Sequence, residues 1–202
     1  MMGDPAAPWK PPIDPAEWHS RRPVPYTGAE YQAMRQGGTD AMTTRKSRLH
    51  AELNPALDDA PRLRALRDYW RARCPADGGI PRRQDIDPTQ LKEHLGSLFI
   101  AEPIEGGADF RYRLIGADLT AIHGHEFTGS KVSELFWGFS AEDAATVINA
   151  YQIVVRKHVI LRAGGAVLWA GKDYLPFDSL HLPILSPDGQ STWLLGELMF
   201  LG

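Results

Sequence analysis

The chain has 202 residues, 43% of them hydrophobic, and a formal net charge of −3. This size predicts one domain with extensions, and the small negative charge provides no field that would attract nucleic acid. The single cysteine, Cys74, excludes an intramolecular disulfide and a zinc site built from several cysteines, which suits a reducing cytoplasm. No apolar run has the length of a membrane span, so we expect a cytoplasmic protein that does not contact a membrane.

Residues 1–57 differ in composition from the rest of the chain. Seven of the 16 prolines lie in the first 25 residues. Because proline fixes φ and removes a backbone donor, we expect a largely disordered, flexible arm over residues 1–57. Translation that starts at Met34 or Met42 would leave residues 1–33 or 1–41 out of the native protein, and the sequence leaves this open. The arm carries aromatic residues that suit docking on the domain or on a partner: Trp9, Trp18 and Tyr26.

Residues 58–96 are expected to contain an amphipathic helix and a connecting segment. The helix is predicted over residues 61–73, with Asp58 or Asp59 as its cap and Pro61 in its first turn. Its apolar face requires a docking surface, either on the domain or in a dimer. In the connecting segment, Asp87 followed by Pro88 predicts the start of a short helix. The apolar positions of the first helix recur at helical spacing: Leu63, Leu66, Tyr69 and Trp70.

Residues 97–202 are expected to form the core of the domain. A helix over residues 140–158 is the clearest in the chain, because its apolar residues fall on one stripe. Alternation in the second strand predicts that Phe110, Tyr112 and Leu114 share one face. Glycines after this strand favour short helical turns, so residues 110–135 are expected to form one wall of a pocket. The predicted strands are residues 97–104, 109–115, 159–169, 174–185 and 191–201.

Three motifs in this order resemble a single-domain PAS family of alphaproteobacteria. They are WRARCPADGGIPRRQDIDP over residues 70–88, LGSLFIAE over residues 95–102, and FRYRLIGADLTAIHGHEFTGSKVSEL over residues 110–135. The resemblance covers about residues 60–201. It implies an α+β fold in which a five-stranded antiparallel sheet carries helices on one face, with a cavity between them. It also implies a sensory, ligand-binding or protein-interaction module, and it specifies no ligand, so the cofactor is unknown.

Four residues of the predicted core are candidates for binding a small molecule in the cavity. Tyrosine, tryptophan and histidine combine an apolar body with a polar atom that can orient a ligand. The competing interpretation is that all four are ordinary core or surface residues. The candidates are Tyr112, Tyr151, Trp169 and His181.

Arg82 and Arg83 are candidates for binding an anion, because guanidinium groups hold phosphate or carboxylate bidentately. The alternative is that they pair with Asp85, Asp87 or Glu102 and stabilise the connecting segment.

The sequence points to no enzyme and no metal site. No catalytic motif, phosphate-binding loop or dinucleotide-binding glycine pattern is present. His123, His125 and Glu126 offer three metal ligands, but residues two apart on a turn need not converge, and turn histidines are the preferred interpretation.

Two functions remain open. The first is a sensor that binds an unknown small molecule and signals to a separate partner protein. The second is a non-enzymatic adaptor with a filled core, which dimerises or docks a partner through the helix at residues 61–73. A packed interior would count against the sensor.

Overall fold

The computed structural model describes residues 50–124, 126–135, 141–169 and 173–201. Its centre is a six-stranded antiparallel sheet with the order β1-β4-β5-β6-β2-β3. Among the described residues, no helix is long and apolar enough to cross a membrane. The strands are β1 His50–Leu53, β2 Leu98–Ile104, β3 Asp109–Ile115, β4 Leu161–Trp169, β5 Asp173–Leu185 and β6 Thr192–Phe200.

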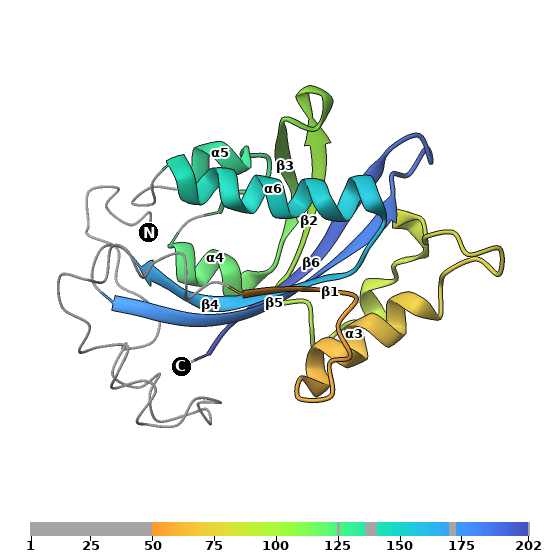
Figure 1. Cartoon of the computed structure of the whole chain (residues 1–202), viewed down its shortest axis with the longest axis horizontal. Helices are drawn as coiled ribbons and strands as arrows, with labels where there is room; N and C mark the ends of the chain where they lie inside the picture. Colours follow the sequence, from red (N-terminus) through yellow and green to blue (C-terminus); the bar gives the residue numbers. More distant parts are fainter. Residues whose placement is uncertain (1–49, 125, 136–140, 170–172, 202) are drawn as a thin grey trace, which may run out of the picture.

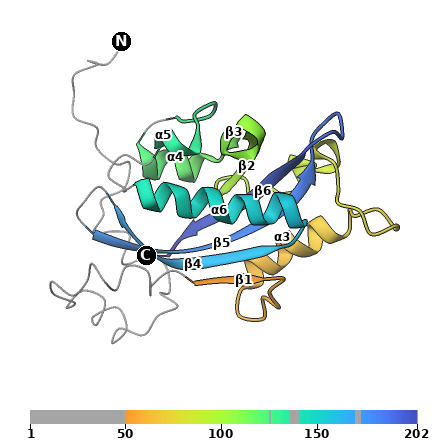
Figure 2. The same ribbon diagram turned by 45° about the horizontal axis from the view of Figure 1, so that its top comes forward.

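The helices cover both faces of the sheet. Helices α4 (Ala117–His123), α5 (Val132–Leu135) and α6 (Ala141–Lys157) lie on one face, and α3 (Pro61–Arg71) lies on the other (Figures 1 and 2). Each face therefore has its own buried apolar cluster, which we call the α6 core and the α3 core. The α6 core includes Phe99, Phe110, Tyr112, Tyr151 and Val154, and the α3 core includes Leu63, Leu66, Trp70, Ile100 and Leu195.

The predicted α+β fold is confirmed, and the five predicted strands are present with ends that differ by at most two residues. The sheet also has a sixth strand, β1, which lies within residues 1–57, where we expected only an arm. Strand β1 pairs with β4, from His50 opposite Gly164 to Leu53 opposite Leu161. Its residues 51–53 are exposed, so backbone pairing rather than burial holds it. A four-residue strand without an apolar face leaves no periodicity for sequence analysis to detect.

Helix α3 packs its apolar face on the sheet of its own chain. Leu63 and Leu66 are completely buried, and Nε1 of Trp70 donates a hydrogen bond to the Pro183 carbonyl of β5 at 2.8 Å. The sequence left open whether this apolar face docks on the domain or in a dimer, and the structure shows that it docks on the domain. The predicted cap is wrong, because Ala60 precedes the helix without a side-chain cap and the Asp59 carboxylate binds Arg162.

The connecting segment begins a short helix after Asp87 as predicted, but this helix ends at Gln90, before Gly96. Asp87 precedes η3 (Pro88–Gln90), and its Oδ1 accepts a hydrogen bond from Thr89 N at 2.9 Å. Its backbone is tied to α3, since Asp87 N donates to the Tyr69 hydroxyl at 2.7 Å. Two further short helices are η2 (Arg83–Asp85) and η4 (Glu105–Gly107), the latter in the hairpin between β2 and β3.

Two glycines in the recognised motifs allow β2 and α4 to meet. A Cβ atom at Gly116 would overlap the carbonyl oxygens of Leu95 and Gly96, and a Cβ atom at Gly96 would overlap the Asp118 carboxylate. The approach lets Asp118 N donate to the Gly96 carbonyl at 2.8 Å. Close backbone packing thus requires the glycine in RLIG, whereas the glycine in LGS leaves room for the Asp118 side chain.

The predicted alternation in β3 is wrong at its end. Phe110 and Tyr112 belong to the α6 core, whereas Leu114 packs against the α3 core on the opposite face. The reason is a β-bulge: Ala101 pairs with Tyr112, but the preceding Ile100 pairs with Leu114. The additional residue in β3 reverses the direction of every side chain after it, so Leu114 leaves the predicted pocket wall.

Candidate functional site

Three of the four predicted ligand-binding residues meet in the α6 core. Tyr112 of β3, Tyr151 of α6 and His181 of β5 surround the Phe99 ring of β2. The two tyrosine hydroxyls lie 3.2 Å apart and share a hydrogen bond. The His181 ring centroid lies 5.3 Å from that of Tyr151 and 5.9 Å from that of Phe99. We call these four residues the Tyr–His cluster.

Gly196 of β6 makes room for the centre of this cluster. It pairs with Phe99 on one side and with His181 on the other. A Cβ atom at Gly196 would overlap the Phe99 ring, so the ring occupies the space that a side chain would fill. The ring therefore lies over β6 and reaches both His181 and Tyr151.

The polar groups of the cluster are neutral at pH 7, because burial disfavours their charged forms. Burial raises the pKa of Tyr112 to about 12 and raises the pKa of Tyr151 well above its ordinary value. Burial also lowers the pKa of His181 to about 4.

The hydrogen bonds of His181 determine which of its ring nitrogens carries the proton. The Ser179 hydroxyl donates its hydrogen to the Ala163 carbonyl at 2.8 Å, so it can only accept from Nε2 of His181, 3.0 Å away. Neutral His181 therefore carries its proton on Nε2, and Nδ1 is a bare acceptor. Nδ1 is buried and has no hydrogen-bond partner among the described residues; Nε of Arg111 is the other such atom.

The fourth predicted residue, Trp169, lies at the end of β4, and its side chain is outside the part of the chain that the structure describes. The rings of the cluster pack directly on one another, and this packing counts against a sensor with a preformed cavity. Neither of two hollows at the surface of the described residues is lined by Tyr112, Tyr151 or His181.

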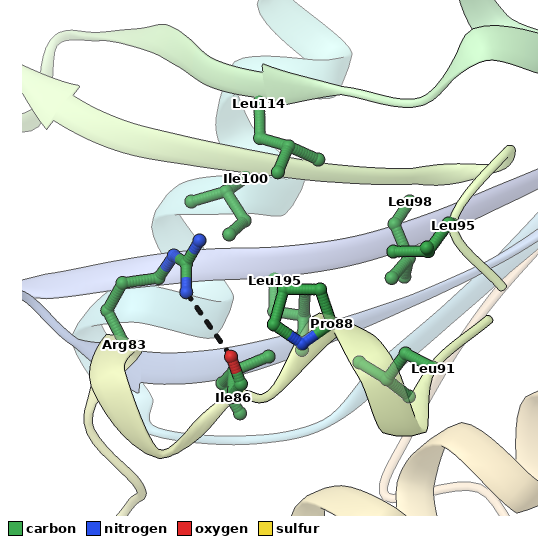
Figure 3. A pocket seen from close by; sticks show the side chains of 9 residues that line it. All are labelled: Arg83, Ile86, Pro88, Leu91, Leu95, Leu98, Ile100, Leu114 and Leu195. Carbon is green, nitrogen blue, oxygen red and sulfur yellow. Dashed lines mark hydrogen bonds between the residues drawn. The ribbon is translucent and has the colours of Figure 1, made fainter.

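Arg82 and Arg83 are adjacent in sequence but their side chains lie in different places. The Arg82 guanidinium lies beside Gly189 in the turn between β5 and β6. Arg83 instead lines an apolar hollow on the α3 face of the sheet (Figure 3). Neither side chain forms an ion pair with a described residue.

The carboxylates that the sequence offered to these arginines have other partners. Glu102 pairs with Arg113, with Oε1 and Nε 2.9 Å apart. Asp87 binds the backbone and hydroxyl of Thr89, and the Asp85 carboxylate accepts a hydrogen bond from the backbone N–H of Arg82 at 2.8 Å.

The candidate metal ligands in the turn after α4 are only partly described. Nδ1 of His123 lies 2.9 Å from the Leu119 carbonyl, and Glu126 accepts a hydrogen bond from Thr128 N. His125 lies outside the described residues. Within those residues, no group of three His, Cys, Asp or Glu side chains is placed to hold a metal ion.

Sequence analysis missed a buried ionic cluster on the α3 face. The Glu197 carboxylate of β6 is completely buried and binds Arg62 of α3, His94 and Ser97. Nδ1 of His94 lies 2.9 Å from Oε2 of Glu197, and the Ser97 hydroxyl donates to Oε1 at 3.0 Å. The one sequence signal was a glutamate inside an otherwise apolar strand, LLGELMF, because such a buried carboxylate requires a partner.

The fold and the Tyr–His cluster define a class of α+β domain in which an antiparallel sheet and a long helix enclose an aromatic interior. A family model described as PAS domain matches residues 59–199. The chain belongs to this family of PAS domains, which are sensory and signalling modules and typically not enzymes.

One solved structure similar to this chain is that of an RNA-binding light-oxygen-voltage receptor. It is 13% identical in sequence with a TM-score of 0.38, and the match covers 62% of this chain and 35% of that receptor. The chain thus spans about a third of the receptor's length. Among curated proteins, none matches this sequence.

Proposed function

We propose that this PAS domain is a sensor that binds a small molecule at the Tyr–His cluster and passes the signal to a separate partner protein. The observation that supports this most directly is the bare Nδ1 of His181. A buried acceptor without a partner costs about 1–3 kcal/mol, and native proteins retain few such atoms. Aromatic rings and two buried hydroxyls surround it, so a ligand that displaced a ring would meet an apolar wall with one acceptor to orient it.

The chemistry of the cluster selects the class of ligand. Nδ1 of His181 requires an O–H or N–H donor. The neighbouring rings of Phe99 and Tyr151 favour an apolar or aromatic body. Since the polar groups of the cluster are neutral, a charged ligand would be buried there without a counter-ion, at high cost. We therefore propose an uncharged molecule that carries one donor on an apolar frame.

Binding would have to displace a ring, because the cluster is packed. The Phe99 ring lies between β6 and α6, so its movement would change how α6 sits on the sheet. That change is the proposed signal. The single cysteine of the chain is consistent with the cytoplasm as the place where it operates.

The same packing supports a second function. With its core filled, the domain would serve as an adaptor that dimerises or binds a partner without a ligand. A partner that docks on α3 would meet the outer face of this helix, since Leu63 and Leu66 are buried against the sheet.

The experiment that tests the sensor follows the ¹⁵N resonance of His181 Nδ1 in the full chain while a probe is added. The probes are phenol, which has an aromatic body and one O–H donor, and toluene, which has the body alone. We expect phenol to shift the Nδ1 resonance upfield, as acceptance of a hydrogen bond requires, and toluene to leave it in place. Native mass spectrometry of the purified chain would then identify a ligand retained from the cell.

His181→Phe and Tyr69→Phe are the matched variants. The first removes the acceptor but keeps a ring, and the second alters a hydroxyl on the α3 face. A retained ligand should be lost only from His181→Phe. If neither probe moves the resonance and the native chain carries no additional mass, the adaptor is the better description.

A further inference from the structure

The hollow beside Arg83 is an apolar depression on the α3 face. Its walls come from the connecting segment, with Ile86 and Leu91, and from the strands, with Ile100, Leu114 and Leu195 (Figure 3). Leu95, at the end opposite Arg83, is 38% exposed and is one of two exposed large hydrophobic residues in the described chain. Leu114 reaches this face only because of the bulge in β3.

The size of this hollow limits what can bind there. The enclosed volume is about 20 Å³. Pockets that enclose a small molecule are typically about 300–1,000 Å³, so this one cannot enclose a free ligand. One large flat side chain of a protein segment can cover such a shallow apolar depression without entering it, and would contact its rim.

The positive charge of Arg83 at the rim of the hollow further restricts which protein segment could dock there. Arg83 is directed along the hollow and donates a single long hydrogen bond, from Nη1 to the Ile86 carbonyl at 3.4 Å (Figure 3). It forms no ion pair with a described residue, and Arg82 stands next to it in sequence. An acidic residue beside the anchoring side chain would therefore gain a charge-assisted hydrogen bond.

We propose that Trp18 of this chain docks over the hollow, across its apolar rim, and that Glu17 pairs with Arg83. Residues 14–18 read DPAEW, which places an acidic residue directly before a large aromatic one. Trp9 is a poorer occupant, because Lys10 follows it and would meet the charge of Arg83.

The length of the chain permits this contact. Thirty-one residues separate Trp18 from β1. Fully extended they span about 100 Å, more than twice the diameter of a domain of this size. Because the contact is intramolecular, its effective concentration is about millimolar, so a dissociation constant below about 1 mM is sufficient to populate it.

The test uses the full chain labelled with 5-fluorotryptophan, whose six tryptophans give separate ¹⁹F resonances. Trp18→Phe assigns the Trp18 signal, and the shift of that signal between H₂O and D₂O measures its exposure. We expect a protected Trp18 in the native chain and an exposed one in Arg83→Glu. The charge exchange Arg83→Glu with Glu17→Arg should restore protection, since it reverses both members of the pair.

Arg82→Glu is the matched control, because Arg82 carries the same charge but does not line the hollow. It should leave Trp18 protected. The Trp70 signal should stay unchanged in all variants, since its Nε1 bond to Pro183 reports on an intact α3 face. A Trp18 signal that is equally exposed in the native chain, or that responds equally to Arg82→Glu, overturns the proposal. So does protection that disappears on dilution, which would indicate the arm of a second copy.

Discussion

Nε of Arg62 in α3 donates a hydrogen bond to Oε1 of Glu197 in β6 at 2.7 Å, and this joins the first helix of the domain to a central strand. The Arg62 guanidinium also donates to the Glu93 carbonyl and to the Ser97 hydroxyl, each at 2.7 Å. One side chain thereby ties α3 to the connecting segment and to the sheet. Because Glu197 is completely buried, its charge depends on Arg62 for compensation and on contacts with His94 and Ser97 for its remaining hydrogen bonds.

Replacement of Arg62 should therefore destabilise the domain. Loss of one partner of a buried ion pair typically costs 3–5 kcal/mol. The Arg62 side chain is 39% exposed, and His94 and Ser97 remain, so we expect Arg62→Met to lower the free energy of unfolding by about 2–3 kcal/mol. Urea denaturation measures this. Arg64→Met, which removes only an exposed pair with Asp58 at 4.0 Å, should cost less than about 0.5 kcal/mol. Equal losses would contradict the assigned role of Glu197.

The neutral state of His181 predicts how stability depends on pH. The pKa of His181 is about 4 in the folded chain and 6.5 in the unfolded chain, so between these values only the unfolded chain binds the additional proton. The free energy of unfolding should therefore decrease as the pH falls from 6.5 to 4, by about 3 kcal/mol in all.

Urea denaturation over this pH range isolates the effect through two variants. His181→Gln should remove this part of the decline, whatever its effect on stability at pH 7. His158→Gln, which alters an exposed histidine bonded to Thr192, should leave the decline unchanged. A decline that is the same in all three chains would show that His181 is charged in the folded state.

The buried tyrosine pair should be visible in an alkaline titration. The pKa of Tyr112 is raised to about 12, and that of Tyr151 is also raised well above 10. Absorbance at 295 nm should therefore show that these two of the six tyrosines remain protonated at pH 11 in the folded chain. Tyr112→Phe should leave the absorbance change up to pH 11 unaltered, whereas in the urea-unfolded chain it should reduce the change by one tyrosine.

Gly196 should tolerate no side chain while Phe99 is present. A methyl group at Gly196 overlaps the Phe99 ring, so Gly196→Ala should cost about 1–3 kcal/mol through overpacking. In Gly196→Ala with Phe99→Leu, the smaller side chain should relieve the overlap. The double variant should then lose less stability in urea denaturation than the sum of the two single variants. Strictly additive losses would show that the Phe99 ring does not occupy the space that a side chain at position 196 would fill.

Patterns within one segment were predictable from the sequence. The apolar spacing of residues 61–71 predicted α3, and the Asp87–Pro88 pair predicted the start of a short helix, whose cap the structure confirms. Both features depend on residues three or four positions apart, so the local sequence is sufficient to predict them. The motif glycines were recognised as a pattern, but their cause, the contact between Gly96 and Gly116, is a contact between separate elements.

Properties that depend on the register between strands could not be predicted from the sequence. The alternation of Phe110, Tyr112 and Leu114 was correct locally, yet one additional residue opposite β2 moved Leu114 to the other face. The placement of Arg83 beside Leu114 depends on the same bulge.

By itself, the sequence determined the individual helices and strands, because periodicity and turn chemistry act over short distances. Its three motifs determined the family and, through that resemblance, the α+β fold. Only the tertiary structure decided that Tyr112, Tyr151 and His181 surround Phe99, and that Glu197 meets Arg62. These pairs lie 13 to 135 residues apart along the chain, and strand register and helix packing bring them together. No local pattern encodes such a distance, since it results from how all the elements pack at once.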